Sequence, residues 1–191
     1  MNLIHILSRI RNLLLHPAQE WPVIASENKS RKEVFRQFVL PLLCLISITI
    51  IIGSTLSTPR TVFSVAYVIC RVAFFISSLG IGLYISSYLI AEIMSRQLGG
   101  PKYARIFSLM AYSCGPAFLV IAVVELFPFF SELIILSLYS CYLYWKGIPA
   151  VLQIQGQKQT TMTILSLVII AVVFCLAFYF FGHIFRALFI E

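Results

Sequence analysis

The sequence contains no aspartate and few charged residues of any kind. Asp, Glu, Lys and Arg make up 11% of its 191 residues, whereas 60% are apolar and the mean hydropathy is +0.97. A soluble domain typically has about 25% charged residues with which to cover its surface. This composition therefore excludes a soluble globular protein and predicts an integral membrane protein.

Motifs for catalysis and metal binding are also missing from the sequence. The lack of aspartate excludes an aspartyl protease, and there is no Gly-rich phosphate loop and no HExxH motif. The five cysteines lie in apolar segments without CxxC spacing, so we interpret them as small buried hydrophobic residues. We therefore predict that the protein is not an enzyme and that it needs no cofactor, no metal and no small-molecule substrate.

Five long apolar runs stand out between polar breaks. Each is close to the ~20 residues that an α-helix needs to cross ~30 Å of hydrocarbon, and isolated strands would leave backbone groups unpaired in lipid. We therefore predict an all-α, polytopic membrane protein with five transmembrane helices. The predicted spans cover residues 38–56, 72–93, 106–127, 129–145 (with a possible extension to 154) and 162–182.

Lys and Arg are distributed unevenly between the two sides of the predicted membrane domain. If the N-terminus is cytoplasmic, eleven of the fourteen lie on the inner side and only Arg60 and Arg186 lie outside. The positive-inside rule then predicts a cytoplasmic N-terminus and an external C-terminus in a bacterial inner membrane. Topology and attraction to anionic lipid explain the net charge of +7, so no nucleic-acid partner is predicted.

The N-terminal residues predict a segment with polar residues before the first span. Apolar residues between Leu3 and Leu14 recur at helical spacing, which predicts an amphipathic helix at the inner interface. This helix could cap the spans or sense the membrane. Pro17 would end it, and Ser26 or Asn28 would cap a second short helix. We predict a collar that faces lipid or a partner, with Trp21 as its interfacial anchor; it consists of Trp21, Lys29, Arg31, Lys32 and Arg36.

Three stretches carry a family resemblance. HPAQEWPVIASENKS and then FVLPLL precede the first span, LGGPKYARIFSLMAYSCGP enters the third, and YLYWKGIPAVL ends the fourth. In this order they resemble the Yip (Ypt-interacting protein) family in its short bacterial form. The resemblance implies a five-helix membrane domain with a cytoplasmic N-terminus. Eukaryotic members bind small prenylated GTPases through a longer cytosolic region, and we do not carry this role over because only residues 1–36 precede the first span.

The predicted organisation has three parts. Residues 1–36 form the cytoplasmic amphipathic helix and collar, residues 37–185 form the five-helix membrane domain, and residues 186–191 form a short outer tail.

Charged residues inside or at the edges of the spans are functional candidates, because their burial in lipid is costly. Arg71 either lies deep in the second span or, if that span begins at residue 72, extends its side chain to the outer surface. It can pair with Glu125 or Glu132 near the outer leaflet as a structural clasp. Glu92 is predicted to be an edge charge at the inner interface.

Lys146 allows two interpretations. In the favoured one, the aromatic residues before it form an interfacial belt and Lys146 reaches cytoplasmic head groups. In the other, the fourth span continues to residue 154, and Gly147 and Pro149 break it inside a protein-lined cavity.

Small residues recur every four positions in the second span, at Ser78, Gly82 and Ser86. This spacing allows close helix approach and predicts a packing face, within one chain or between protomers.

Two functional hypotheses follow from these features. The favoured one is a non-enzymatic scaffold or adaptor that binds membrane lipid and another membrane protein or a second copy of itself. The alternative is a small transporter or channel that acts as an oligomer. Its support is the set of charges within the spans, which are Arg71, Glu92, Glu125 and Lys146.

Overall fold

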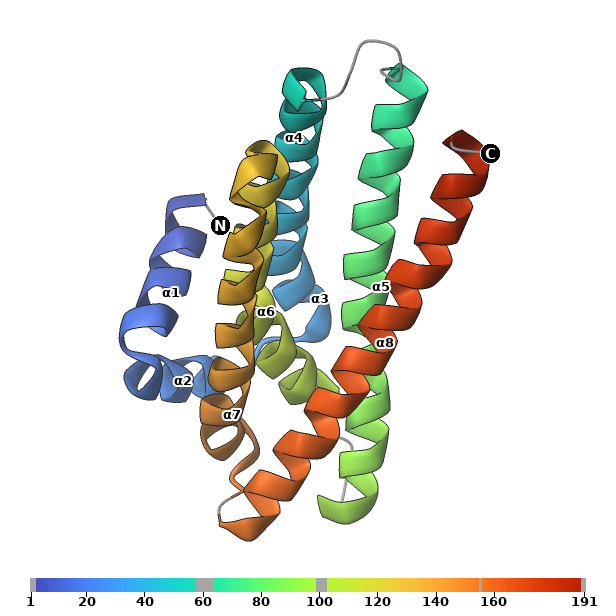
Figure 1. Cartoon of the computed structure of the whole chain (residues 1–191). Coiled ribbons are helices and arrows are strands. Elements are labelled where there is room, and N and C mark those ends of the chain that lie inside the picture. Colours follow the sequence, from blue (N-terminus) through green and yellow to red (C-terminus); the bar gives the residue numbers. More distant parts are fainter. Residues whose placement is uncertain (1–2, 58–63, 99–102, 155, 190–191) are drawn as a thin grey trace.

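The computed structural model describes residues 3–57, 64–98, 103–154 and 156–189 (Figure 1). Within these ranges the regular elements are all helices, and there is no strand. Arg60 and Lys102, which entered the topology argument, lie outside the described residues. In chain order the helices are α1 (Leu3–Leu15), α2 (Pro17–Ser26), α3 (Arg31–Val34), η1 (Phe35–Val39), α4 (Leu40–Ser57), α5 (Val65–Leu98), α6 (Tyr103–Leu126), η2 (Pro128–Leu138), α7 (Tyr139–Leu152) and α8 (Gln157–Phe189).

Among the described residues, four helices are long and apolar enough to cross a membrane. They cover Arg31–Leu56, Val65–Arg96, Tyr103–Leu126 and Gln157–Leu188. The chain is therefore an all-helical, multi-pass membrane protein. Helix α5 begins at Val65, seven residues before the predicted start of the second span.

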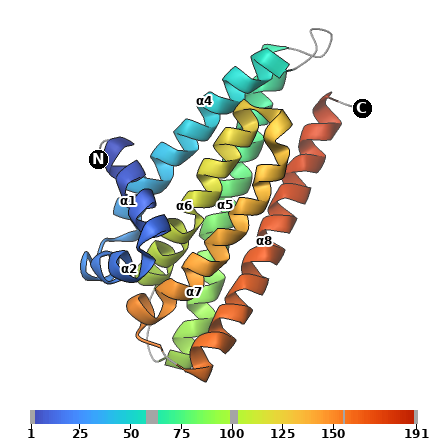
Figure 2. The ribbon, with the colours of Figure 1, turned by 60° about the vertical axis from the view of Figure 1, so that its left-hand side comes forward.

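The fourth predicted span has a different construction from the one expected. Instead of one α-helix, it consists of the 3₁₀-helix η2 followed by the α-helix α7, and Phe130 inside η2 has non-helical backbone angles. At about 2.0 Å and 1.5 Å per residue, these helices of 11 and 14 residues have a combined length of about 43 Å. Figure 2 shows them running alongside α6.

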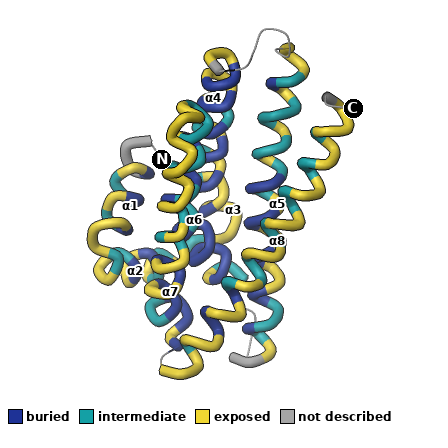
Figure 3. The backbone as a smooth tube through the Cα atoms, viewed as in Figure 1, coloured by how far each residue is buried: buried dark blue, intermediate teal, exposed yellow. Residues whose placement is uncertain are grey.

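Helix α6 is the central element of the bundle. In its most apolar stretch 67% of the residues are buried, against 6% in the corresponding stretch of α8. Helices α4 and α7 pack on α6, whereas α8 packs mainly along α5, and Figure 3 shows the outer surface of α8 as largely exposed. Phe74 of α5 contacts Phe178 and Phe185 of α8, with ring centroids 5.6 and 6.0 Å apart.

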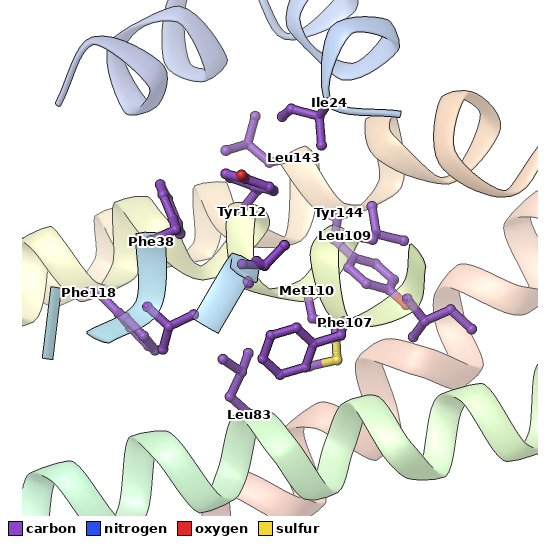
Figure 4. Close-up of a cluster of buried hydrophobic side chains, with 14 of the residues drawn as sticks. Ile24, Phe38, Leu83, Phe107, Leu109, Met110, Tyr112, Phe118, Leu143 and Tyr144 are labelled. Carbon is purple, nitrogen blue, oxygen red and sulfur yellow. The ribbon is translucent and has the colours of Figure 1, made fainter. Parts of the chain in front are cut away.

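The core is assembled around aromatic side chains of α6 (Figure 4). Tyr112 is buried and packs against Phe38 of η1, with ring centroids 4.5 Å apart. Phe107 and Phe118, one turn or more to either side, are also buried. Because these groups come from one continuous helix, α6 fixes the positions of the elements that surround it.

The first span starts earlier than its apolar run. Helices α3, η1 and α4 follow one another without a break from Arg31 to Ser57. The capping residue is Ser30, whose side chain accepts from the Glu33 backbone while the Glu33 carboxylate accepts from the Ser30 backbone, so the predicted cap at Ser26 or Asn28 is wrong. The wider π-helical turn lies directly before Pro41, which has no backbone N–H to donate.

The bundle has two ends with different contents. Helix α2 lies toward one end, together with the last turns of α5 and α7 and the first turns of α6 and α8 (Figure 1). We call this the α2 end. The opposite end, which we call the C-terminal end, holds the last turn of α4, the first turns of α5 and η2, and the last turn of α8.

Candidate functional site

Arg71 and Glu125 form an ion pair near the C-terminal end. The Arg71 guanidinium donates to the Glu125 carboxylate at 2.9 Å, and the two side chains are 26% and 11% exposed. Arg71 lies six residues into α5, which is about 9 Å along the helix. Of the two partners considered from the sequence, the structure pairs Arg71 with Glu125, while Glu132 is exposed.

The same glutamate takes part in a close contact between helix backbones. A Cβ atom added to Gly53 of α4 would lie 1.9 Å from the Glu125 carbonyl oxygen and 3.3 Å from the Cα atom of Leu126. Only glycine allows this approach of α4 to α6. Gly53 and the Arg71–Glu125 pair together join α4, α5 and α6, and the sequence analysis did not identify the role of Gly53.

Glu92 is held at the α2 end of the bundle. Its carboxylate accepts a hydrogen bond from the Tyr103 hydroxyl at 2.7 Å and pairs with Arg96, one turn further along α5, at 3.2 Å. The Tyr103 ring also lies below the guanidinium of Arg31, 5.7 Å from its centroid. These contacts connect α3, α5 and α6 at their charged ends.

Lys146 lies on the exposed surface of α7. Its ammonium group is 5.8 Å from the centroid of the Tyr142 ring. Helix α7 continues past Lys146 through Pro149 to Leu152 without a break. The cavity interpretation does not describe this site, because Lys146 is on the outside and Gly147 is buried in a helix contact, and the interfacial belt stays a prediction.

Trp21 does not face lipid, so its predicted role as an interfacial anchor is wrong. Its side chain is 1% exposed and packs against Gly147 of α7. A Cβ atom on Gly147 would lie 2.4 Å from Leu109 Cδ1 and 2.7 Å from Trp21 Cε2. Trp21 therefore fixes α2 to α6 and α7, an arrangement that spacing in the sequence did not reveal.

The four basic residues of the collar have different surroundings. Arg31, Lys32 and Arg36 are exposed on α3 and η1, whereas Lys29 is half-buried and pairs with Glu27 at 2.9 Å. The binding role of this set stays a prediction, but three of its cations are accessible.

The N-terminal helices are joined by an ionic network that the sequence analysis missed. The Arg9 guanidinium donates to Glu20 at 2.7 Å and also to Glu27, which in turn pairs with Lys29. Helix α1 buries Ile6, Ile10 and Leu13, so its polar side makes these bonds while its apolar side packs inward. The network joins α1, α2 and the following turn, across sequence separations that leave no local pattern.

The pKa values of this network follow from its geometry. Burial alone would lower the pKa of Arg9, but its hydrogen bonds to Glu27 and Glu20 outweigh burial and raise this pKa above its ordinary value. Burial alone would raise the pKa of Glu27, but its bonds to Lys29 and Arg9 outweigh burial and lower that pKa. Both groups are therefore held in their charged forms.

The small residues of α5 pack within the chain. Ser78 and Ser86 are fully buried, and a Cβ atom on Gly82 would lie 3.1 Å from the Phe174 ring of α8. Ser86 donates its hydroxyl proton to the Gly82 carbonyl at 2.7 Å. Of the two packing roles predicted for this face, the structure places it inside the monomer.

Two cavities border Glu125 and the cations Lys29 and Arg105. One, of about 430 Å³, lies between α5, α6, η2, α7 and α8 and has a mainly apolar wall that includes Cys114, Cys141 and Glu125. The other, of about 300 Å³, lies at the α2 end and is lined partly by Lys29 and Arg105. No group of three His, Cys, Asp or Glu side chains that could hold a metal occurs among the described residues.

The sequence of this chain also matches a known protein family. A model of the Yip1 domain family matches residues 11–179, which is most of the chain. The chain belongs to the Yip1 domain family. The resemblance inferred from three short stretches of sequence is thereby confirmed.

The Yip1 match covers the end of α1, the collar and the helices as far as the middle of α8. Members of the Yip1 family are in general non-enzymatic membrane proteins. Searches of curated proteins and of solved structures gave no match. The family therefore identifies a membrane-embedded helical domain, and specific partners must be argued from this chain itself.

Proposed function

We propose that this Yip1 protein is a non-enzymatic membrane scaffold that binds another membrane protein, or a second copy of itself, and organises lipid. The observation that carries this proposal is the placement of the charges in the helices. Arg71 and Glu125 neutralise each other, Glu92 is bonded to Tyr103 and Arg96, and Lys146 is on the outer surface. A transport pathway would need such groups to line a polar passage.

The proposal includes a topology of five crossings in a bacterial inner membrane, with η2 and α7 together making the fourth. Their combined length of about 43 Å exceeds the ~30 Å hydrocarbon layer, which supports this count. Collar residues and the basic ends of α5 and α6 gather toward the α2 end, which supports a cytoplasmic N-terminus and an external C-terminus. The division at residues 36 and 185 belongs to this proposal, although helices run through both positions.

The partner surface in this proposal is the exposed part of the collar. Arg31, Lys32 and Arg36 present three cations on one short stretch of helix at the start of the first span. Cations in this position attract anionic lipid head groups or acidic segments of a neighbouring membrane protein.

Affinity purification in lipid nanodiscs tests the proposal. The full chain is cross-linked in its native membrane and purified, and bound proteins are identified by mass spectrometry. We expect one recurrent membrane protein or a covalent dimer, and we expect Lys32→Gln with Arg36→Gln to reduce its yield. The matched control is Lys158→Gln, an exposed cation on α8 outside the collar. Repeated recovery of the chain alone, as a monomer, would contradict the scaffold role.

A further inference from the structure

The cavity at the α2 end that borders Lys29 and Arg105 has a partly polar lining. It has a volume of about 300 Å³ and lies between the end of α2, the first two turns of α6 and the last turn of α7. Its polar lining consists of Asn28, Lys29, Arg105 and Ser108. Two cationic side chains, one amide and one hydroxyl group therefore line the same cavity.

Ser108 is the informative member of this set. Its side chain belongs to a residue that is only 8% exposed, it lines the cavity, and its hydroxyl makes no hydrogen bond to the described residues. The Ser108 hydroxyl oxygen is not among the fully shielded side-chain atoms that lack a partner, so it is open to the cavity and can bind a group placed there. Ser86 and Ser166 are buried and donate to carbonyl groups of their own helices, whereas buried Ser78 of α5 makes no hydrogen bond to the described residues. Ser108 is left with its hydroxyl free toward the cavity.

The charges at this site favour an anion. Arg105 is exposed at the cavity and has no ion pair among the described residues. Lys29 pairs with Glu27, but that carboxylate is shared with Arg9 and does not line the cavity. The first turn of α6 also contributes backbone N–H groups that have no partner within the helix. The local field is therefore positive.

We propose that this cavity binds a phosphate group between Arg105, Lys29 and the Ser108 hydroxyl. A guanidinium group donates two parallel hydrogen bonds to a phosphate, an ammonium group adds a point charge, and a hydroxyl satisfies a further oxygen. Ser108 lies about 8 Å from the start of α6, a depth suited to a lipid head group. Basic pockets between helices on the cytoplasmic side commonly take such groups. The inference extends the proposed role of the protein in organising lipid. It rests on that proposed function only where it identifies a lipid as the source of the phosphate.

The test measures binding to the full chain in nanodiscs of phosphatidylcholine. In one arm the discs contain phosphatidic acid, and in the other inorganic phosphate is added at constant ionic strength; the readout is the shift in melting temperature across a concentration series. We expect Arg105→Gln and Ser108→Ala each to weaken phosphate binding by about tenfold, because each removes a hydrogen bond to the anion. Arg36→Gln, which removes an exposed cation outside the cavity, should bind like the original chain.

Ser108→Ala keeps every charge, so its effect separates a built site from general attraction of anions. A shift with phosphatidic acid alone assigns the site to a lipid, a shift with inorganic phosphate alone assigns it to a soluble phosphate, and both support the pocket. Equal binding by Ser108→Ala, Arg105→Gln and the original chain would overturn the proposal. That outcome would not change the recovery of a membrane partner in the cross-linking experiment. Failure of the phosphate site and failure of the scaffold function can therefore be distinguished.

Discussion

At the residue scale, single contacts between distant positions determine how the helices fit. Gly147 and Trp21 lie in two of the stretches that carry the family resemblance, but they are far apart in the sequence, and no spacing indicated that they define the contact of α2 with α7. The Ser30 capping box is the opposite case. Its Ser-x-x-Glu spacing is visible in the sequence and could have identified the start of the first span. Local signals could thus be predicted, whereas close contacts across the bundle could not.

The Gly147 contact predicts a large effect from one added methyl group. Gly147→Ala would place a Cβ atom 2.4 Å from Leu109 and 2.7 Å from Trp21, so the side chains must move. We expect a loss of about 1–3 kcal/mol in the free energy of unfolding, measured by denaturation in mixed micelles. The control is Gly80→Ala, whose Cβ atom would meet nothing closer than 3.9 Å. Equal stability of the two variants would contradict the tight contact.

The Arg71–Glu125 pair predicts coupled effects on stability. Removing either charge leaves its partner uncompensated in apolar surroundings, so Arg71→Gln and Glu125→Gln should each cost about 2–4 kcal/mol of unfolding free energy. The double variant should cost less than the sum of the two by at least ~1 kcal/mol. Glu132→Gln serves as the control, because Glu132 is exposed. Additive losses in the double variant would mean that the pair does not act as a clasp.

At the element scale, four of the five apolar runs coincide with described helices that are long and apolar enough to cross a membrane, but the runs did not show how each helix is built. The length of a membrane span is set by the thickness of the bilayer, so the number of consecutive apolar residues predicts it. The 3₁₀ geometry of η2, the π-helical turn before Pro41 and the inward packing of α1 depend on neighbouring elements. The ionic network that fixes α1 and α2 likewise depends on groups that meet only in the folded chain.

That network predicts acid sensitivity of the N-terminal helices. Because the pKa of Glu27 is lowered below its ordinary value near 4.5, its stabilising effect is full above that value and is lost as the pH falls through the lowered pKa. Acidification from pH 7 to below 4 should therefore release α1 and α2 and expose Trp21. Fluorescence of Trp21 in a Trp145→Phe background measures this, since the chain has two tryptophans.

The matching control for acid sensitivity is Glu27→Gln in the same background. This variant lacks the titrating carboxylate, so its Trp21 emission should change less over the same acidification. The same acid transition in both proteins would show that Glu27 does not control the docking of these helices.

At the scale of the whole molecule, the chain is a Yip1-family bundle in which the charged side chains of the described residues are paired or turned outward. Composition alone predicted a membrane protein, because too few charged residues exist to cover a soluble surface. The two cavities were not predictable, since they arise where helices from distant parts of the sequence diverge. The larger one has an apolar wall, which suits hydrocarbon rather than water.

The accessibility of Cys114 to water tests the scaffold account most directly. Cys114 lines the larger cavity, which lies between α5, α6, η2, α7 and α8. A variant that retains only this cysteine is treated in sealed vesicles with a membrane-impermeant maleimide from each side. Glu132→Cys and Lys158→Cys, at exposed positions, are the reactive controls. The account predicts no labelling of Cys114 from either side, and rapid labelling at the rate of the controls would contradict it.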